Sequence, residues 1–347
     1  MLIYFGIFIV LVLLSIRKIY IKDENKDYLS RENTLIVNGI FVILVFFSHF
    51  YSYYTESKFM DSIPQIILGK IGQLMVTTFL FFSGYGIYES IKSKGKKYVD
   101  SFFKRRFLPT FLNFAIAVTI FYIFNLISGI KYDVRTNILA YTGWTSIGNS
   151  NWYMLAIFSI YFFVMIAFNI FKSDTKNNKR NSLILITIFS VLYLILINIV
   201  KDRWYVDTFL CFVCGMWYSY FKEKIDKIFE KPIKYYIFVF LIALSFLTMY
   251  IVNIKIFSYN VYMHNIVSIL FVVMICFILK KIKLENRILE FFGKNIFWIY
   301  ILQRLPMMAL KGKLNIYINF VICFIITIGL AVIMQKLTDC LWKKLKS

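Results

Sequence analysis

Charged residues are scarce in this sequence, and acidic residues are fewer than half as many as basic ones. Of 347 residues only 17% are charged, with 18 Asp and Glu against 40 Lys and Arg, while 60% are apolar. Soluble domains contain about 25% charged and roughly 45–50% apolar residues. Proline is also rare, with four in the whole chain. A soluble globular enzyme is therefore excluded, because so much apolar surface has no aqueous core to fill.

Eleven apolar stretches occupy most of the chain and leave no room for a folded domain outside a membrane. Each has about 16–22 residues, close to the roughly 20 residues that a helix needs to cross a bilayer. Because backbone groups in lipid must be hydrogen-bonded within the protein, the stretches predict an all-α, polytopic transmembrane helix bundle. We expect spans at residues 2–16, 34–54, 71–90, 110–128, 152–171, 183–200, 205–221, 235–253, 261–279, 293–310 and 315–334.

The formal charge of +22 would suit a partner such as nucleic acid. The basic residues, however, lie in short loops between the apolar stretches, where they set membrane orientation. If the first span runs from outside to inside, 30 Lys and Arg fall on the inner side and 10 on the outer side. This bias predicts an external N-terminus and a cytosolic C-terminus in a cell membrane, which we expect to be bacterial, and no nucleic-acid partner.

One helical domain with short extensions is expected. No positive residue precedes the first apolar run and no small-residue cleavage pattern follows it, but Arg17 and Lys18 follow at once, as expected for a retained anchor. No internal repeat or linker divides the chain. We therefore predict an anchor span with a cytosolic loop at 1–33, a transmembrane domain at 34–334 and a basic cytosolic tail at 335–347.

The five cysteines do not indicate a redox or metal site. Cys211 and Cys214 form a C-x-x-C pattern, but they lie inside an apolar stretch without further ligands. We interpret them as small apolar helix residues and expect no metal.

The chain has only two histidines, and both lie in the outer part of a predicted span. Ionisable groups at membrane depth usually face a bundle interior, which makes His49 and His264 candidate functional residues. Imidazole can also accept a proton near physiological pH. Asn38 precedes His49 by eleven positions, almost three helical turns, so both side chains share one helix face about 17 Å apart along the axis.

Several segments, taken in order, resemble the acyltransferase-3 family of integral membrane proteins. Residues 39–49 resemble the first helix of the family domain, in which a basic residue precedes the histidine by eleven positions; here that position is Asn38. Gln303 similarly stands where the family usually has histidine. Further segments that resemble family blocks are 79–87, 102–109, 151–155, 212–216 and 292–302.

The resemblance implies a ten-helix domain over about residues 34–334, preceded here by one extra span. It also implies transfer of an acyl group, typically acetyl from cytosolic acetyl-CoA, to a hydroxyl of a cell-surface glycan or lipid-linked saccharide. His49 matches the family histidine, and we assign the catalytic positions to His49 and Asn38. His49 would be a general base that deprotonates the acceptor hydroxyl, or the nucleophile of a transient acyl-imidazole.

The polyanionic donor requires cations on the inner side. Arginine forks and lysine charges are the usual phosphate partners, and a basic stretch follows the third span. Arginines three apart are frequent in the family here; Arg106 fits one of them, and the other position is Phe103. We assign donor binding to Arg105, Arg106, Lys92 and Tyr85.

The acceptor requires aromatic rings and hydrogen-bonding groups on the outer side, since a sugar offers hydroxyls and apolar ring faces. Asp207 and Arg304 are charges near the membrane edge that could orient a histidine or the substrate. The predicted acceptor-binding residues are Tyr53, Trp152, Tyr153, Asp207, His264 and Arg304.

Two other functions stay open from the sequence. A transporter or flippase for a lipid-linked saccharide would also use many aromatics and a basic inner face. A scaffolding relative without activity is the third possibility, because Asn38 and Gln303 replace ionisable groups of the family.

Overall fold

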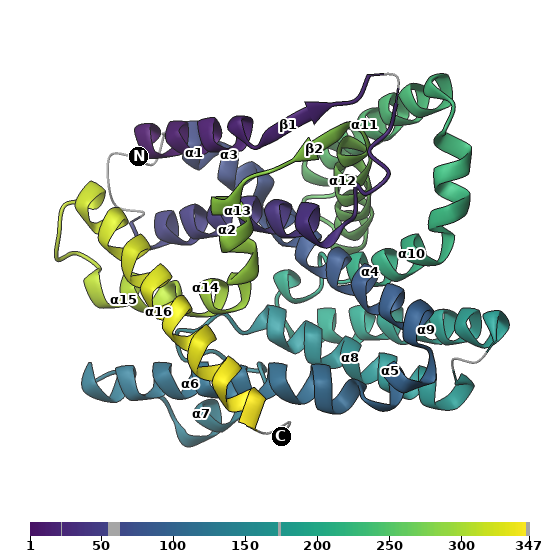
Figure 1. Ribbon diagram of the computed structural model, residues 1–347. Helices are drawn as coiled ribbons and strands as arrows, with labels where there is room; N and C mark the ends of the chain where they lie inside the picture. Colours follow the sequence, from purple (N-terminus) through teal and green to yellow (C-terminus); the bar gives the residue numbers. More distant parts are fainter. Residues whose placement is uncertain (22, 55–62, 173–174, 345–347) are drawn as a thin grey trace.

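The computed structural model confirms an all-α, polytopic bundle. It describes residues 1–21, 23–54, 63–172 and 175–344, and most of them are helical (Figure 1). The α-helices are α1 Leu2–Leu14, α2 Arg31–Tyr53, α3 Ile63–Ile71, α4 Thr77–Lys94, α5 Lys96–Asp100, α6 Leu108–Ile127, α7 Val134–Ala140, α8 Trp152–Phe171, α9 Lys176–Val200, α10 Leu210–Phe229, α11 Pro232–Lys255, α12 Val261–Lys281, α13 Arg287–Lys294, α14 Ile296–Leu302, α15 Arg304–Leu310 and α16 Ile316–Lys344. Short turns of 3-10 helix lie at Gly72–Val76 and Arg203–Tyr205, and a π-helical turn lies at Phe103–Phe107.

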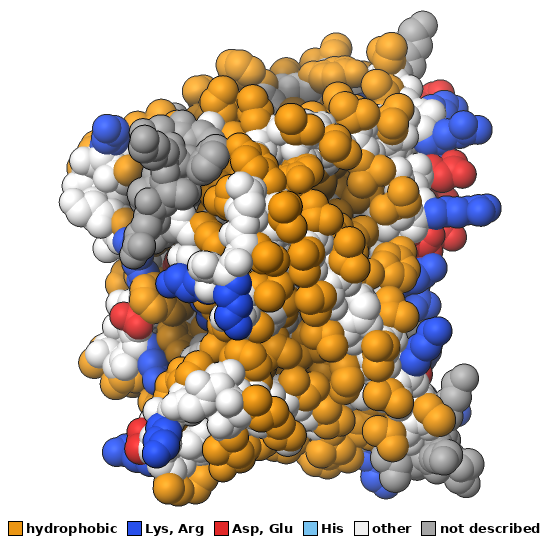
Figure 2. All heavy atoms as spheres, turned by 90° about the vertical axis from the view of Figure 1, so that its left-hand side faces the viewer, with side chains coloured by type: hydrophobic (Ala, Val, Ile, Leu, Met, Phe, Trp, Pro, Cys, Tyr) orange, Lys and Arg blue, Asp and Glu red, His pale blue; other side chains and the backbone are white. Residues whose placement is uncertain are grey.

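Eight helices in the described part of the chain are long and apolar enough to cross a membrane. They correspond to the predicted spans that begin near residues 34, 71, 110, 152, 183, 235, 261 and 315. A broad hydrophobic band covers the face shown in Figure 2, and the charged side chains lie along its two margins. This distribution fits a multi-pass membrane protein, whose apolar side chains face lipid between two polar rims.

The other three predicted spans differ from single long helices. Helix α1 has 13 residues and is about 20 Å long, shorter than the roughly 30 Å of a bilayer core. The predicted span 205–221 begins later, at Leu210. The predicted span 293–310 is divided into the end of α13, α14 and α15, with breaks at Asn295 and Gln303.

A two-stranded antiparallel ribbon, which the hydropathy pattern did not predict, extends α1. Strand β1 (Ile16–Ile19) pairs with β2 (Ile282–Leu284), which follows α12 directly (Figure 1). At its other end α1 packs against the second half of α2, where the rings of Phe5 and Phe47 lie 5.6 Å apart. Helix and strand together therefore run along the bundle from the end that carries His49 to the end that carries Arg31, which we call the His49 end and the Arg31 end.

Two helix crossings bring backbones into direct contact through glycine. Gly84 of α4 lies against Phe212 of α10, and Gly215 of α10 lies against Phe81 of α4. A second reciprocal pair, Gly39 of α2 and Gly293 of α13, brings these two helices together in the same way. Small residues allow such close approach between membrane helices. These crossings position α2 and α4, which form two walls of a central cavity.

Candidate functional site

The central cavity lies inside the bundle and has a volume of about 790 Å³. Its walls come from α2, α4, α6, α8, α14 and the π-helical turn before α6. Polar side chains on these walls include Arg31, Asn38, Tyr85, Arg106, Tyr153 and Tyr300. The cavity thus extends from the first residue of α2 to Tyr153 and Tyr300 in the interior of the bundle.

His49 lies next to the deep end of this cavity. Its ring centroid is 6.3 Å from that of Tyr300, and the rings of Tyr300 and Tyr153 are 5.3 Å apart. Both tyrosines line the cavity, whereas His49 itself is not part of the wall. The Nδ1 atom of His49 is buried and has no hydrogen-bond partner in the described part of the structure. An imidazole nitrogen left free in this way is available to accept a proton from a substrate.

Arg304, which is half-buried, is a second polar group beside His49. Its guanidinium lies 5.9 Å from the centre of the Tyr53 ring, and its Nε atom is buried without a hydrogen-bond partner among the described residues. The positive charge of Arg304 lies close enough to His49 for the two side chains to interact electrostatically. Because α14 ends at Leu302 and α15 begins at Arg304, the break at Gln303 directs this arginine into the site. Broken helices occur at membrane depth where they line a cavity.

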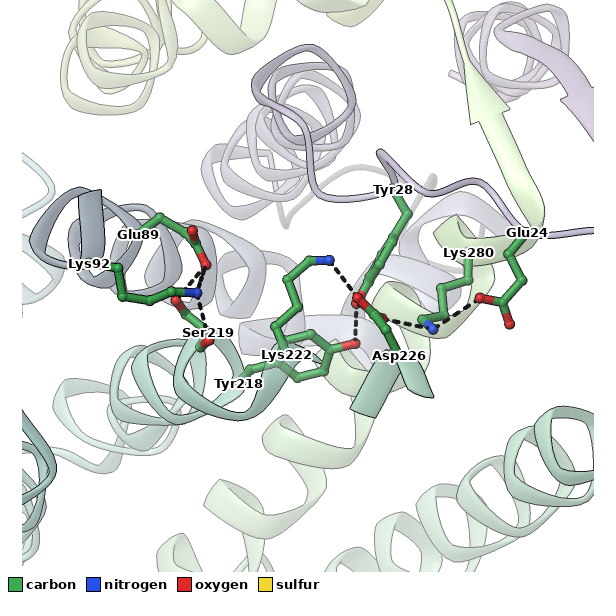
Figure 3. A network of polar contacts seen from close by, with 9 residues as sticks. All are labelled: Glu24, Tyr28, Glu89, Lys92, Tyr218, Ser219, Lys222, Asp226 and Lys280. Carbon is green, nitrogen blue, oxygen red and sulfur yellow. Dashed lines mark hydrogen bonds and ion pairs between the residues drawn. The ribbon is translucent and has the colours of Figure 1, made fainter. Parts of the chain in front are cut away.

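The expected donor residues fall into two groups. Tyr85 and Arg106 line the cavity, and Arg106 donates from Nε to the Tyr98 hydroxyl at 3.2 Å. Its position in a π-helical turn is typical of functional sites. Arg105 is exposed and outside the wall. Lys92 also lies outside the wall, and donates to Glu89 at 2.8 Å and to the Ser219 carbonyl at 3.2 Å (Figure 3).

The expected acceptor residues are likewise divided. Tyr153 lines the cavity, Arg304 lies near His49, and Tyr53 lies against Arg304. Trp152 packs edge-on against Tyr153 but is not part of the wall. Asp207 and His264 belong to a different cluster, and neither lines the cavity.

Asp207 and His264 are joined through Tyr259. The Tyr259 hydroxyl donates to Asp207 Oδ2 at 2.9 Å, and the rings of Tyr259 and His264 stack at 4.5 Å. The Arg203 guanidinium lies 3.8 Å from the centre of the Tyr259 ring, and His264 Nδ1 is 3.4 Å from the side-chain nitrogen of Asn253. Tyr259 has a left-handed backbone (φ +70°), a conformation that residues other than glycine rarely adopt.

We expect Asp207 to titrate near neutral pH. Burial raises the pKa of Asp207 to about 7, although the hydrogen bond from Tyr259 and the Arg203 charge act in the opposite direction. A raised carboxyl pKa contributes stability that is complete below the unfolded value of about 3.9 and is lost as the pH rises through 7. Relative to Asp207→Asn, the wild type should therefore lose thermal stability between pH 4 and pH 7. Parallel unfolding curves across this range would contradict the assignment.

Arg31, Tyr161 and Tyr300 line the cavity but were not among the candidate residues from the sequence. A signal was present for Arg31, which precedes His49 by 18 positions, or five whole turns of one helix. No signal singled out the two tyrosines among the 25 of the chain. Within the described residues, no group of three or more His, Cys, Asp or Glu side chains could hold a metal ion.

The fold and cavity define a multi-pass membrane protein with a buried polar site between its helices. Residues 36–336 match the model of the acyltransferase-3 family, described as an acyltransferase domain. The match covers most of the chain, so the chain belongs to this family and is a membrane acyltransferase. No curated protein and no solved structure matches the chain.

Proposed function

We propose that this acyltransferase moves an acetyl group from cytosolic coenzyme A to a hydroxyl of a glycan or lipid-linked saccharide on the opposite side of the membrane. The observation that carries the proposal is the cavity that joins the Arg31 end to the tyrosines beside His49. The excess of Lys and Arg in one set of loops supports a cytosolic Arg31 end. The two substrates would then enter the bundle from opposite ends.

The chemistry needs one base and one site for negative charge. His49 takes the proton of the acceptor hydroxyl while the hydroxyl oxygen attacks the thioester carbonyl. The new C–O bond forms, the C–S bond breaks, and the proton passes from His49 to the departing thiolate. Arg304 supplies positive charge beside the reacting carbonyl, where negative charge develops in the transition state. Tyr153 and Tyr300 offer ring faces and hydroxyls to the acceptor.

Purified protein in liposomes tests this function. Acetyl-CoA labelled in the acetyl group is supplied on the side of the membrane that the Arg31 end faces. A glycan or lipid-linked saccharide acceptor is supplied on the opposite side. We expect label in the acceptor and release of free CoA thiol in equal amounts. Empty liposomes give the background for both readings.

The transporter alternative gives a different result in the same liposomes. It is favoured by the interruption of α13, α14 and α15 next to the cavity, because broken helices often form transport sites. Movement of the saccharide across the bilayer without label or free thiol would support transport and contradict acetyl transfer. The absence of both label in the acceptor and movement of the saccharide would support a relative without activity.

A further inference from the structure

Residues 23–30 precede the matched family domain, yet they are packed firmly onto the bundle. The backbone N–H of Asn25 donates to the Lys280 carbonyl at 2.8 Å, and the Asn25 side chain lies within 3.3 Å of the carbonyls of Leu279 and Ile282. Lys281 donates to the Asp23 carbonyl at 2.8 Å. This segment is therefore fixed to the end of α12.

A partly buried network of ion pairs and hydrogen bonds, with Lys280 at its centre, holds the same segment against α10 (Figure 3). Lys280, which is fully buried, pairs with Asp226 of α10 at 2.9 Å and with Glu24 of the segment at 3.3 Å. The Tyr28 hydroxyl donates to Asp226 at 2.9 Å, and Lys222 contacts the other carboxylate oxygen at 2.6 Å. Buried charges are stable only when they are paired in good geometry, so this network favours a single position of the segment.

The fixed segment in turn positions the start of α2. The Asn33 side chain donates to the Asp27 carbonyl at 2.9 Å, and the Ser30 hydroxyl accepts from the Asn33 N–H at 3.3 Å. These bonds close the turn from the segment into α2. Leu29 and Arg31 consequently form part of the wall of the central cavity.

Arg31 also borders a second cavity of about 540 Å³ at the same end of the bundle. Two further cations, Lys26 and Lys283, line this smaller space together with acidic side chains, of which Glu24 is paired with Lys280. Arg31 itself forms no ion pair with any residue that the structure describes. Arg31 is therefore a cation without an ion-pair partner among the described residues, and it lies between the smaller polar cavity and the central cavity.

We propose that residues 23–31 are part of the donor site and that Arg31 binds a phosphate group of the acyl donor. The proposal rests on the proposed function, in which a coenzyme A thioester enters at this end. Among the described residues, Arg31 and Arg106 are the two cations on the wall of the larger cavity, and Arg106 already donates to Tyr98. Within the part of the chain that the structure describes, the Arg31 guanidinium has no ion-pair partner, and its fork fits phosphate oxygens. The thioester arm would continue along the cavity toward His49.

The test compares a charged donor with a neutral one. In the purified full-length protein, Arg31→Gln should raise KM for acetyl-CoA about tenfold, the usual result of losing one charge-assisted hydrogen bond. The kcat value should change little, because Arg31 is remote from His49 on α2. KM for acetyl-pantetheine, which has the same thioester arm but no phosphate of the nucleotide part, should stay unchanged. Arg31→Lys should restore part of the affinity for acetyl-CoA.

Arg180→Gln is the matched control, because Arg180 is, like Arg31, an exposed arginine near the start of a helix, but it lines neither of the two cavities. It should leave both KM values unchanged. The proposal is overturned if Arg31→Gln equals the wild type for acetyl-CoA, or if it raises KM equally for both donors, which would indicate a general disturbance of the cavity. If the wild type neither binds CoA nor transfers acetyl, the proposed function fails instead, so the two failures are distinct.

Discussion

Replacement of His49 by alanine should lower acetyl transfer by about 10²- to 10⁴-fold, the usual contribution of a positioned general acid or base. His49 is the histidine beside the deep end of the cavity, and its Nδ1 has no partner in the described structure that would compete for a proton. Initial rates of label transfer in liposomes measure the effect. Binding of CoA should be retained, because the cations at the Arg31 end are unchanged.

Ser48→Ala provides the control for this loss. Ser48 is the neighbouring residue of α2 and points about 100° away from His49 around the helix. It should retain most of the activity, whereas a comparable loss in both variants would assign the effect to the local helix. A single-turnover reaction without acceptor separates the two routes: labelled protein in the wild type indicates an acyl-imidazole, and its absence favours general base catalysis. Transfer by His49→Ala at the wild-type rate would remove His49 from the mechanism.

The helices that the sequence predicted best are those set by a continuous apolar run. The span predicted at 152–171 is α8, Trp152–Phe171. The predicted span 293–310 is equally apolar, but Asn295 donates to the Phe291 carbonyl at 2.9 Å and Gln303 to the Tyr300 carbonyl at 3.0 Å. Such side-chain bonds to the backbone compete with regular helix, and a hydropathy pattern does not record them.

Contacts between distant segments explain the other differences. The turn before α10 is held by Asn265 of α12, which donates to the Val206 carbonyl at 2.9 Å and accepts from the Leu210 N–H at 3.1 Å. This contact links residues more than 50 positions apart. Helix α10 therefore begins later than predicted because of a residue in another helix, which the apolar run of the predicted span does not include. The pairing of β1 with β2 joins segments far apart in the chain in the same way.

The candidate site was predictable only as far as helix geometry reaches. The spacing of Asn38 and His49 placed both on one face of α2, and Asn38 does line the cavity that ends beside His49. Arg31 also lies a whole number of helical turns from His49 and therefore on the same face of α2. It was not chosen as a candidate, because a cation at the start of a span is also explained as an orientation signal. The separate grouping of Asp207 with His264 depends on Tyr259, which lies in a loop whose conformation the sequence did not indicate.

Replacement of Gly84 by alanine should destabilise the bundle by about 1–3 kcal/mol or more, the usual cost of overpacking a close contact. A Cβ atom at Gly84 would lie 2.0 Å from the Phe212 carbonyl oxygen, and one at Gly215 would lie 2.1 Å from that of Phe81. Both obstacles are backbone, which cannot rotate away, so α4 and α10 must separate. Unfolding of the purified protein in detergent, by heat or denaturant, measures the loss.

Gly86→Ala is the matched comparison for Gly84→Ala, since it adds the same methyl group two positions along the same helix. A Cβ atom there meets nothing within 4 Å. Alanine is favoured over glycine in a helix by about 1 kcal/mol, so Gly86→Ala should unfold at or above the wild-type temperature. Tyr85 lies between the two glycines on α4 and lines the cavity, so displacement of α4 in Gly84→Ala should also reduce CoA binding. Equal stability of the two variants would show that α4 and α10 can separate at little cost. The position of Tyr85 would then not depend on the close packing of these two helices.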